Sequence, residues 1–255
     1  MIPVTTSDLQ AAESRRITLT VDAGSYSPAT IDIAVALAAS MDATLQGFFI
    51  EDADLLQMAD LPCSVEVVFP SATQRRLDSA SLRQQLRQLG AQAREYLARS
   101  AQRANVQWSF AHMPGKGSEA GLVLAKASDH LVISRSGRHP PPQHKPHAMR
   151  ILLVDDHSPA LLAALRALLQ QMPTTAMEIV LVGTGGEGPH SSMAIDEVLH
   201  DAPYVRLSRL HMNVLEEVIA LQVTSSDYVI VSRYQPLQFI EKLVRESICP
   251  VILVA

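Results

Sequence analysis

The sequence is poor in aromatic residues, with 5 phenylalanines, 5 tyrosines and 1 tryptophan in 255 residues. Alanine, leucine and valine must therefore fill most of the core. The chain has only two cysteines, Cys63 and Cys249, which lie far apart and outside any CxxC pair. This pattern excludes a disulfide framework and a cysteine-based zinc site, and it indicates a reducing compartment.

Long apolar runs are also absent, because no segment approaches the roughly 18 consecutive apolar residues of a membrane helix. The first 16 residues do not show the charged-then-apolar order of a signal peptide. The formal net charge of −5 argues against the basic surface of a nucleic-acid-binding protein. We therefore expect a cytoplasmic protein that binds neither membranes nor nucleic acid.

The first half of the chain shows alternating strand and helix patterns. Residues 16–22 are β-rich, residues 29–43 have helical apolar spacing, and residues 44–52 read as a second strand. This βαβ unit favours a parallel sheet covered by helices. Residues 53–76 are less regular, with Pro62 and Pro70 as breakers, and a long amphipathic helix with an arginine-rich solvated face follows over 77–104. A strand, a short helix and a fourth strand complete this half.

The second half repeats this order. Asp22-Ala-Gly-Ser matches Asp155-Asp-His-Ser, and residues 128–135, "SDHLVISR", match residues 226–233, "SDYVIVSR". Only 12 residues, 139–150, separate the first repeat from the next strand, and they are rich in proline. The first repeat therefore has no room for the last helix and strand of the second.

The sequence thus predicts an α/β protein of two tandem Rossmann-like domains, each a mainly parallel sheet flanked by helices. The predicted units are a first domain at 15–138 that lacks the last helix and strand, a Pro/His linker at 139–149, and a second domain at 150–255.

The order of these motifs resembles the universal stress protein family in its tandem form, whose domains are of the adenine nucleotide alpha hydrolase-like type. The carrying stretches are "VDAGSYSPATIDIAVALAASMDATLQGFFIED" and "SDYVIVSR…ESICPVILVA". Members typically open with a strand ending in Asp, a small-residue turn with Ser and an Ala-rich helix, and they end with a Cys-Pro-Val strand. The resemblance extends from about residue 15 to residue 255.

ATP-binding members resemble one another in a glycine pattern that follows the fourth strand. Here that position reads Ser134-Arg-Ser-Gly137 in the first half and Ser232-Arg-Tyr-Gln in the second, and no glycine follows Gly188. Glycines let backbone amides approach phosphates, so the resemblance implies an incomplete ATP site. The candidate nucleotide-binding residues are Asp22, Gly115, Gly117, Ser134 and Gly137, with Asp155 and Ser232 as equivalents in the second domain.

Two readings remain for the strand-end aspartates. In ATP-binding relatives a carboxylate at the position of Asp22 and Asp155 lies near the adenine and ribose. Alternatively, a strand-end Asp caps the helix that follows it.

The resemblance implies a non-catalytic binding and signalling module of the stress response, with an unidentified protein partner and no required cofactor. The alternative is an ATP-binding, slowly hydrolysing member that uses the first domain only.

Three other motifs are weaker. The segment "RILLVDDHS" resembles the start of a response-regulator receiver domain, but the third strand of that half lacks the phospho-acceptor Asp. Residues 183–188, "GTGGEG", satisfy GxGxxG but follow the second strand of their unit, so they read as a loop. His139, His144 and His147 lie among prolines, and we expect solvated side chains and no metal site.

The C-terminal strand suggests self-association. Because the first domain lacks a counterpart to pair with it, residues Val251, Ile252, Leu253 and Val254 are predicted to form a bare edge. An exposed edge invites pairing, so we expect a homodimer joined through this strand.

Overall fold

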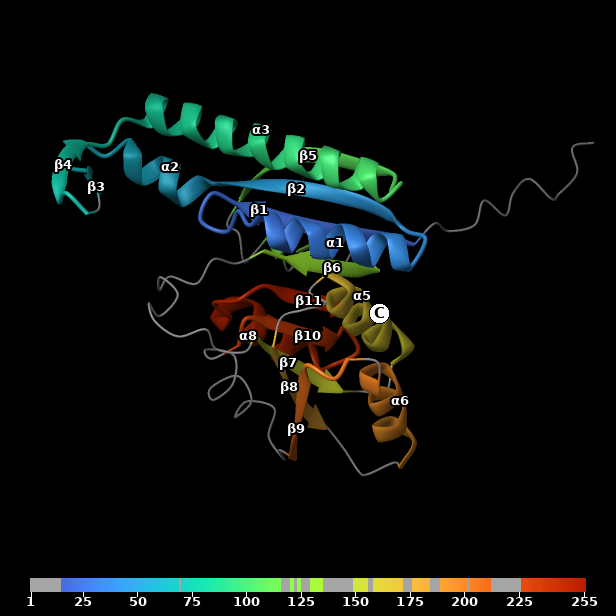
Figure 1. The fold of residues 1–255 in the computed structure, drawn as a ribbon. Helices are drawn as coiled ribbons and strands as arrows, with labels where there is room; N and C mark the ends of the chain where they lie inside the picture. Colours follow the sequence, from blue (N-terminus) through green and yellow to red (C-terminus); the bar gives the residue numbers. More distant parts are fainter. Residues whose placement is uncertain are drawn as a thin grey trace, which may run out of the picture.

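The computed structural model describes most of the chain (Figure 1). The described residues are 15–68, 70–115, 120–121, 123–124, 129–134, 149–155, 158–171, 176–183, 189–200, 202–211 and 226–255. Side chains at positions 68, 76, 155, 189–194 and 211 are not described.

Strands and helices alternate in both halves, which confirms the predicted α/β class. The first half contains β1 (Arg16–Asp22), α1 (Pro28–Ser40), β2 (Thr44–Asp52), α2 (Ala53–Ala59), β3 (Val65–Val68), β4 (Thr73–Arg76), α3 (Ser79–Arg103), β5 (Trp108–Gly115) and β6 (His130–Ile133). The second half contains β7 (Met149–Asp155), α5 (Pro159–Gln171), β8 (Met177–Gly183), α6 (Pro189–His200), β9 (Val205–His211), β10 (Tyr228–Ser232), α8 (Leu237–Glu246) and β11 (Val251–Val254). Residues 212–225, between β9 and β10, lie outside the described residues.

Nine strands from both halves form one sheet in the order β5-β2-β1-β6-β11-β10-β7-β8-β9. Each half contributes four parallel strands in the same relative order. The repeat inferred from the sequence is therefore visible as a mirrored strand order around β11. The predicted domain boundaries, and the Pro/His linker that falls mostly outside the described residues, stay predictions.

Strand β11 lies at the centre of the sheet. It pairs in parallel with β10, where Ile230 is opposite Ile252, and antiparallel with β6, where Val132 is opposite Ile252. The prediction of a bare edge at residues 251–254 is wrong, because hydrogen-bonding partners occupy both sides of the strand. Strand β11 thus acts as the fifth strand of both halves. The homodimer stays a prediction, but β11 is not available to join two copies.

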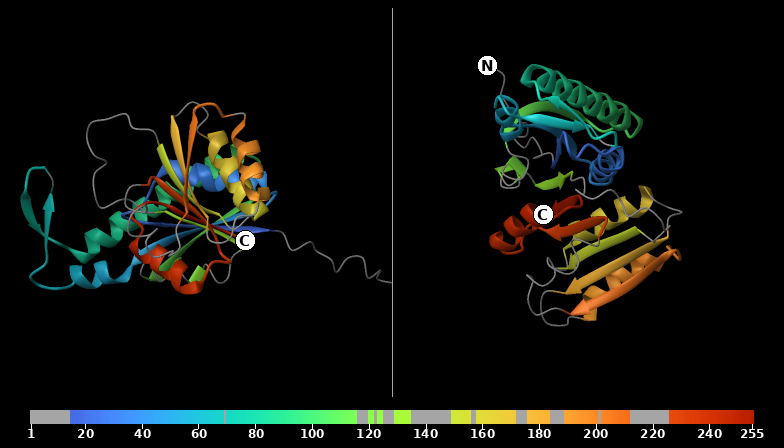
Figure 2. Two further views of the ribbon diagram at one scale, coloured as in Figure 1. Left: turned by 90° about the horizontal axis from the view of Figure 1, so that it is seen from below. Right: turned by 90° about the vertical axis from the view of Figure 1, so that its left-hand side faces the viewer.

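Alternating side chains of the sheet face two separate cores. One core contains Leu153, Ile230 and Ile252 and is covered by α1, α3, α5 and α6. The other contains Leu152, Val229 and Leu253 and is covered by α8 and the short segment around Leu124. Figure 2 shows α8 on the side of the sheet opposite to α1 and α5. Burial on both faces explains why these strands read as continuous apolar runs.

Helix α1 connects the two halves on the first of these faces. It begins with Pro28, whose fixed φ suits a first helical turn. Its buried residues occupy almost every position from Thr30 to Ala38, because the helix packs on the sheet and also against α3 and α5. A helix buried on several sides has no strong polar face, and Asp32 is its only charged residue.

The Ser-Asp start shared by the two repeats has a structural role. Arg16 N–H at the start of β1 donates to Asp129 Oδ2 (3.0 Å), and Arg150 N–H at the start of β7 donates to Asp227 Oδ2 (2.7 Å). Each aspartate therefore fixes the start of the first strand of its half beside the fourth strand. The identical contact supports the register of the repeat.

Removing either aspartate should weaken the fold to a similar extent. We expect Asp129→Ala and Asp227→Ala each to lower the free energy of unfolding by about 1 kcal/mol, the contribution of one hydrogen bond. The double variant should show the sum, because distant sites are additive. Urea unfolding followed by circular dichroism measures this. A neutral Asp129→Ala beside a costly Asp227→Ala would contradict the equivalence.

The segment 53–77, which we call the arm, differs from the irregular loop predicted for 53–76. Helix α2 begins at a capped position, because Asp52 Oδ1 accepts hydrogen bonds from Asp54 N–H (2.9 Å) and Leu55 N–H (3.2 Å). Strands β3 and β4 then form a separate two-stranded antiparallel sheet. Figures 1 and 2 show this hairpin projecting from the body beyond the start of α3.

Candidate functional site

The carboxyl ends of parallel strands are where open α/β sheets bind ligands. In the first half, Asp22 ends β1, Gly115 ends β5, and Ser134 directly follows β6. Because β5, β2, β1 and β6 are parallel neighbours, these three residues all lie at the carboxyl-terminal ends of the strands, on one side of the sheet. Gly117 and Gly137, also predicted for this site, lie outside the described residues.

Asp22 closes the turn that follows β1. Its Oδ1 accepts a hydrogen bond from Gly24 N–H (2.9 Å), while its own N–H donates to Ser25 Oγ (2.9 Å). Ser25 N–H donates to the Asp22 carbonyl (3.1 Å), so the backbone of residues 22–25 is fixed. The half-buried carboxylate thus caps its own turn, whereas α1 begins after Ser27 without a side-chain cap.

Ser134 ties β6 to this turn. The residue is 2% exposed, its Oγ donates to the Ser25 carbonyl, and its N–H donates to the Thr20 carbonyl (2.9 Å). The hydroxyl therefore points into the protein, toward the turn that Asp22 closes. Asp22 and Ser134 are brought together through Ser25, and their role as nucleotide contacts stays a prediction.

Gly115 is further from this pair, since β2 lies between β5 and β1. It pairs with Asp52, whose carboxylate caps α2. A Cβ at position 115 would lie 3.7 Å from the Ala120 Cβ, an ordinary contact. Space alone therefore does not require glycine there, but its φ of 157° is one that other residues rarely adopt. Adjacent strands are about 4.8 Å apart, so a ligand reaching both Gly115 and Asp22 would have to cross two strand spacings.

The equivalent positions of the second half are arranged differently. Asp155 ends β7 beside Gly183 of β8, and its side chain is outside the description. Ser232 ends β10, is fully buried, and its Oγ accepts a hydrogen bond from Tyr234 N–H (3.2 Å). Ser232 thus closes a local turn, while Ser134 joins two strands, although both occupy the same place in the repeat.

A second polar site was not predicted from the sequence. Asp32 of α1 accepts hydrogen bonds from Tyr96 OH (2.7 Å) and Ser100 Oγ (2.7 Å) of α3, and Arg103 Nη2 donates to Ser100 Oγ (3.0 Å). Hydrogen bonding to the Asp32 carboxylate, with burial, raises the pKa of Tyr96. The sequence signal was a lone acid in an apolar helix, together with two hydroxyl residues four positions apart in α3.

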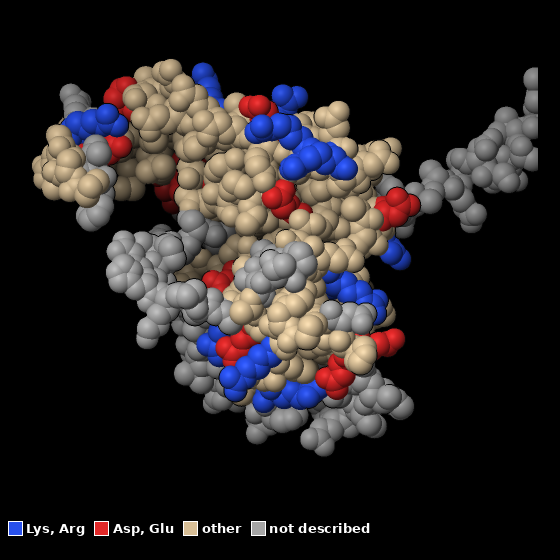
Figure 3. All heavy atoms as spheres, viewed as in Figure 1, with Lys and Arg blue, Asp and Glu red and all other residues tan. Residues whose placement is uncertain are grey.

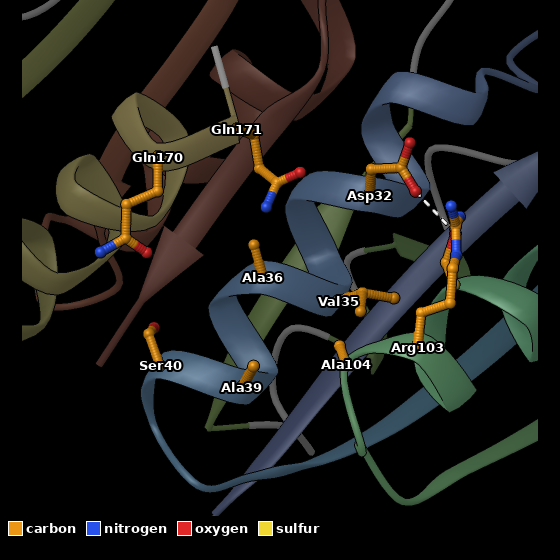
Figure 4. A pocket seen from close by; sticks show the side chains of 10 residues that line it. Asp32, Val35, Ala36, Ala39, Ser40, Arg103, Ala104, Gln170 and Gln171 are labelled. Carbon is orange, nitrogen blue, oxygen red and sulfur yellow. Dashed lines mark hydrogen bonds between the residues drawn. The ribbon is translucent and has the colours of Figure 1, made fainter. Parts of the chain in front are cut away.

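Asp32, Ser100 and Arg103 border a cleft of about 530 Å³ between α1, α3 and the end of α5 (Figure 4). Figure 4 shows Arg103 on one wall, with Gln170 and Gln171 across from it. The ten lining residues include no histidine, cysteine or lysine. The cleft can therefore offer hydrogen bonds, one carboxylate and one guanidinium to a ligand.

The described part of the chain holds no cluster of three His, Cys, Asp or Glu side chains suited to a metal ion. His139, His144 and His147 lie outside it, so the expected absence of a metal stays a prediction. None of its helices is long and apolar enough to cross a bilayer. Figure 3 shows acidic and basic side chains interspersed over one face of the molecule.

Comparisons with known proteins found similar solved structures but no matching family model. No family model and no curated protein matches it. A protein of unknown function from Pseudomonas aeruginosa PAO1 aligns over 95% of this chain and 92% of its own, with 8% identity and a TM-score of 0.40. A putative universal stress protein from Pseudomonas aeruginosa UCBPP-PA14 aligns over 95% of this chain and 93% of its own, with 8% identity and a TM-score of 0.38. A glycosyltransferase from Rickettsia africae ESF-5 aligns over 92% of this chain and 78% of its own, with 10% identity and a TM-score of 0.29.

Proposed function

We propose that the chain is a universal-stress-protein-like, non-catalytic binding and signalling module that acts in a cytoplasmic stress response through a protein partner. One observation supports this most directly. The groups expected to face a nucleotide already have partners within the protein: Asp22 caps Gly24, and Ser134 donates to Ser25. Together with the missing glycines, this argues for a site that has lost complete ATP binding.

The alternative is ATP binding and slow hydrolysis by the first domain alone. It is favoured by the position of Asp22, a half-buried carboxylate at the carboxyl end of β1 beside Ser134. Ligands bind at this end of such sheets, and the described hydrogen bonds engage only Oδ1 of Asp22.

Isothermal titration calorimetry with ATP and Mg²⁺ separates the two proposals. We expect no saturable heat at ATP concentrations up to about 1 mM, a limit that corresponds to a binding free energy near −4 kcal/mol. Micromolar binding would overturn the proposal. If that binding were lost in Asp22→Asn and retained in Asp155→Asn, the alternative would replace it, since only the first domain would then hold the nucleotide.

A further inference from the structure

The arm gathers exposed apolar side chains. In the described part of the chain, seven large hydrophobic residues are exposed, and four of them are Met58, Leu61, Val65 and Val67. Each of these four is more than half exposed, at 52 to 57%. Single exposed hydrophobic residues are normal, but a cluster within ten positions marks a contact surface. In Figure 3 the end of the arm shows uncharged surface beside acidic and basic groups.

Hydrogen bonds within the arm fix its turn, and one exposed ion pair joins it to α3. Ser64 N–H donates to the Leu61 carbonyl (3.2 Å), and Ser64 Oγ donates to the Met58 carbonyl. Arg83 Nη2 of α3 lies 3.6 Å from Asp60 Oδ2. The hairpin of the arm has no third strand among the described residues. An isolated two-stranded sheet is marginally stable in water and gains stability from a third strand or a covering layer.

The sheet itself does not need the arm. The corresponding connection in the second half, from β8 to β9, uses α6 as its described helix and shows no hairpin in its described residues. Helix α6 still covers the same face of the sheet as α3 does. The arm is therefore an addition to one repeat, and its apolar surface serves something other than the core.

The two edges of the hairpin differ in chemistry. Strand β4 carries Arg75, and charged side chains protect an edge from pairing. Strand β3 carries Val65 and Val67, β-branched residues that favour pairing. Hydrogen-bonded pairs alternate along an antiparallel ladder. Leu77 N–H donates to the Ser64 carbonyl (3.0 Å), so the backbone groups of Val65 and Val67 face outward.

We propose that the arm binds a second copy of this chain by antiparallel pairing of β3 with β3, around a two-fold axis at Glu66. In this register Val65 lies opposite Val67 of the second copy, and four valines form one apolar face. The two hairpins become a four-stranded antiparallel sheet, which meets the requirement for a third strand. A two-fold contact closes on itself, whereas pairing of β3 with β4 would continue into a filament.

The charges are compatible with this arrangement. Glu66 of each copy would face the other at the axis, and like charges directly opposite are unfavourable. However, each Glu66 already lies 2.6 Å from its own Arg75 Nε, so the four charges sum to zero. A standard interface buries about 800 Å² per partner. The four valines and the paired β3 strands bury a smaller area than that, so we expect a weak, reversible dimer.

Sedimentation velocity over about 1 to 500 μM tests the surface, because weak dimers dissociate at the low end of this range. We expect wild type to pass from monomer to dimer and Val67→Lys to stay monomeric throughout. The matched control is Val123→Lys, since Val123 is an exposed valine on the body, at 66%. It should dimerise like wild type. A wild type that stays monomeric, or a dimer that Val67→Lys does not weaken, overturns the proposal.

Disulfide trapping tests the register independently. In a Cys63→Ser background, Glu66→Cys should give a covalent dimer under mild oxidation, because the two cysteines would meet at the axis. The control, Thr73→Cys on exposed β4, should remain monomeric. A covalent dimer from Thr73→Cys and none from Glu66→Cys would overturn the β3 pairing. Melting curves that match wild type show that each variant is folded.

Discussion

Replacing Ile252 in β11 by alanine is expected to destabilise both halves of the protein at once. Ile252 is 1% exposed and lies between Ile230 of the second half and Val132 of the first. Truncating a buried isoleucine to alanine costs about 2 to 5 kcal/mol, a large share of a typical stability of about 5 to 15 kcal/mol. The same cluster contains residues of α1 and α5, so the loss is shared.

Two probes distinguish shared from independent unfolding. Trp108, the single tryptophan, lies in β5 at the edge of the sheet on the first-half side and packs against this core. Its fluorescence therefore follows the first half, whereas far-UV circular dichroism follows the whole chain. In urea we expect both probes to report one transition, as a two-state protein does. Both midpoints should fall together in Ile252→Ala.

The matched control is Leu237→Ala, which removes an exposed side chain at the start of α8. Its effect should stay within about 0.5 kcal/mol, as for most surface substitutions. If the Trp108 transition did not move in Ile252→Ala while the dichroism split into two steps, residues 15–138 and 150–255 would be independent domains. The experiment thus tests the predicted domain division as well as the role of β11.

The sequence predicted most strands and their repeat, but it could not predict how β11 is used. A strand buried on both faces has the same apolar pattern at the centre of a sheet as it has beside a partner copy. The missing fifth strand of the first half suggested an open edge. The mirrored arrangement lets Val251–Leu253 fill that gap from the second half, and this depends on contacts more than 100 positions apart.

The arm and the Asp32 cluster were missed for different physical reasons. The hairpin strands are only four residues long, and the nearby Pro62 and Pro70 suggested an irregular loop. The Asp32 cluster joins α1 to Tyr96 and Ser100 of α3, which lie 64 and 68 positions later in the sequence. Periodicity predicts each helix separately, but it does not predict which polar groups meet between helices.

For the candidate nucleotide site, the sequence placed Asp22 and Ser134 correctly at neighbouring strand ends. It did not reveal that both groups bond to the turn at residues 22–25. The alternative reading, that Asp22 caps the next helix, is wrong, because α1 begins after Ser27 without a side-chain cap and the Asp22 carboxylate instead caps Gly24 N–H in the preceding turn. Short-range capping and ligand binding need the same residue type, so the pattern alone does not separate them.

Raising the pH above 10 is expected to weaken the wild-type fold more than that of a Tyr228→Phe variant. Burial, with the nearby negative charge of Asp227, raises the pKa of Tyr228 to about 12. In the unfolded chain a tyrosine titrates near its ordinary pKa of about 10. The unfolded state therefore loses its proton first, and stability falls as the pH rises from about 10 toward 12.

The size of this effect follows from the shift in the pKa of Tyr228. By pH 11.5 wild type should lose about 2 kcal/mol more than Tyr228→Phe, relative to each protein's own value at pH 9. Burial also raises the pKa of Cys249 to about 11. This thiol is present in both proteins, so its own titration cancels in the comparison, and only the repulsion between its thiolate and the Tyr228 phenolate adds to the difference. Urea unfolding at each pH gives the two curves.

The matched control is Tyr234→Phe, because the Tyr234 side chain is 75% exposed and its curve should follow that of wild type. Parallel curves for wild type and Tyr228→Phe would show that the Tyr228 hydroxyl reaches water in the folded state. Tyr228 occupies the place in β10 that His130 holds in β6, and both side chains are buried. The alkaline limb of stability therefore reports on a position that the two repeats fill with different titratable groups.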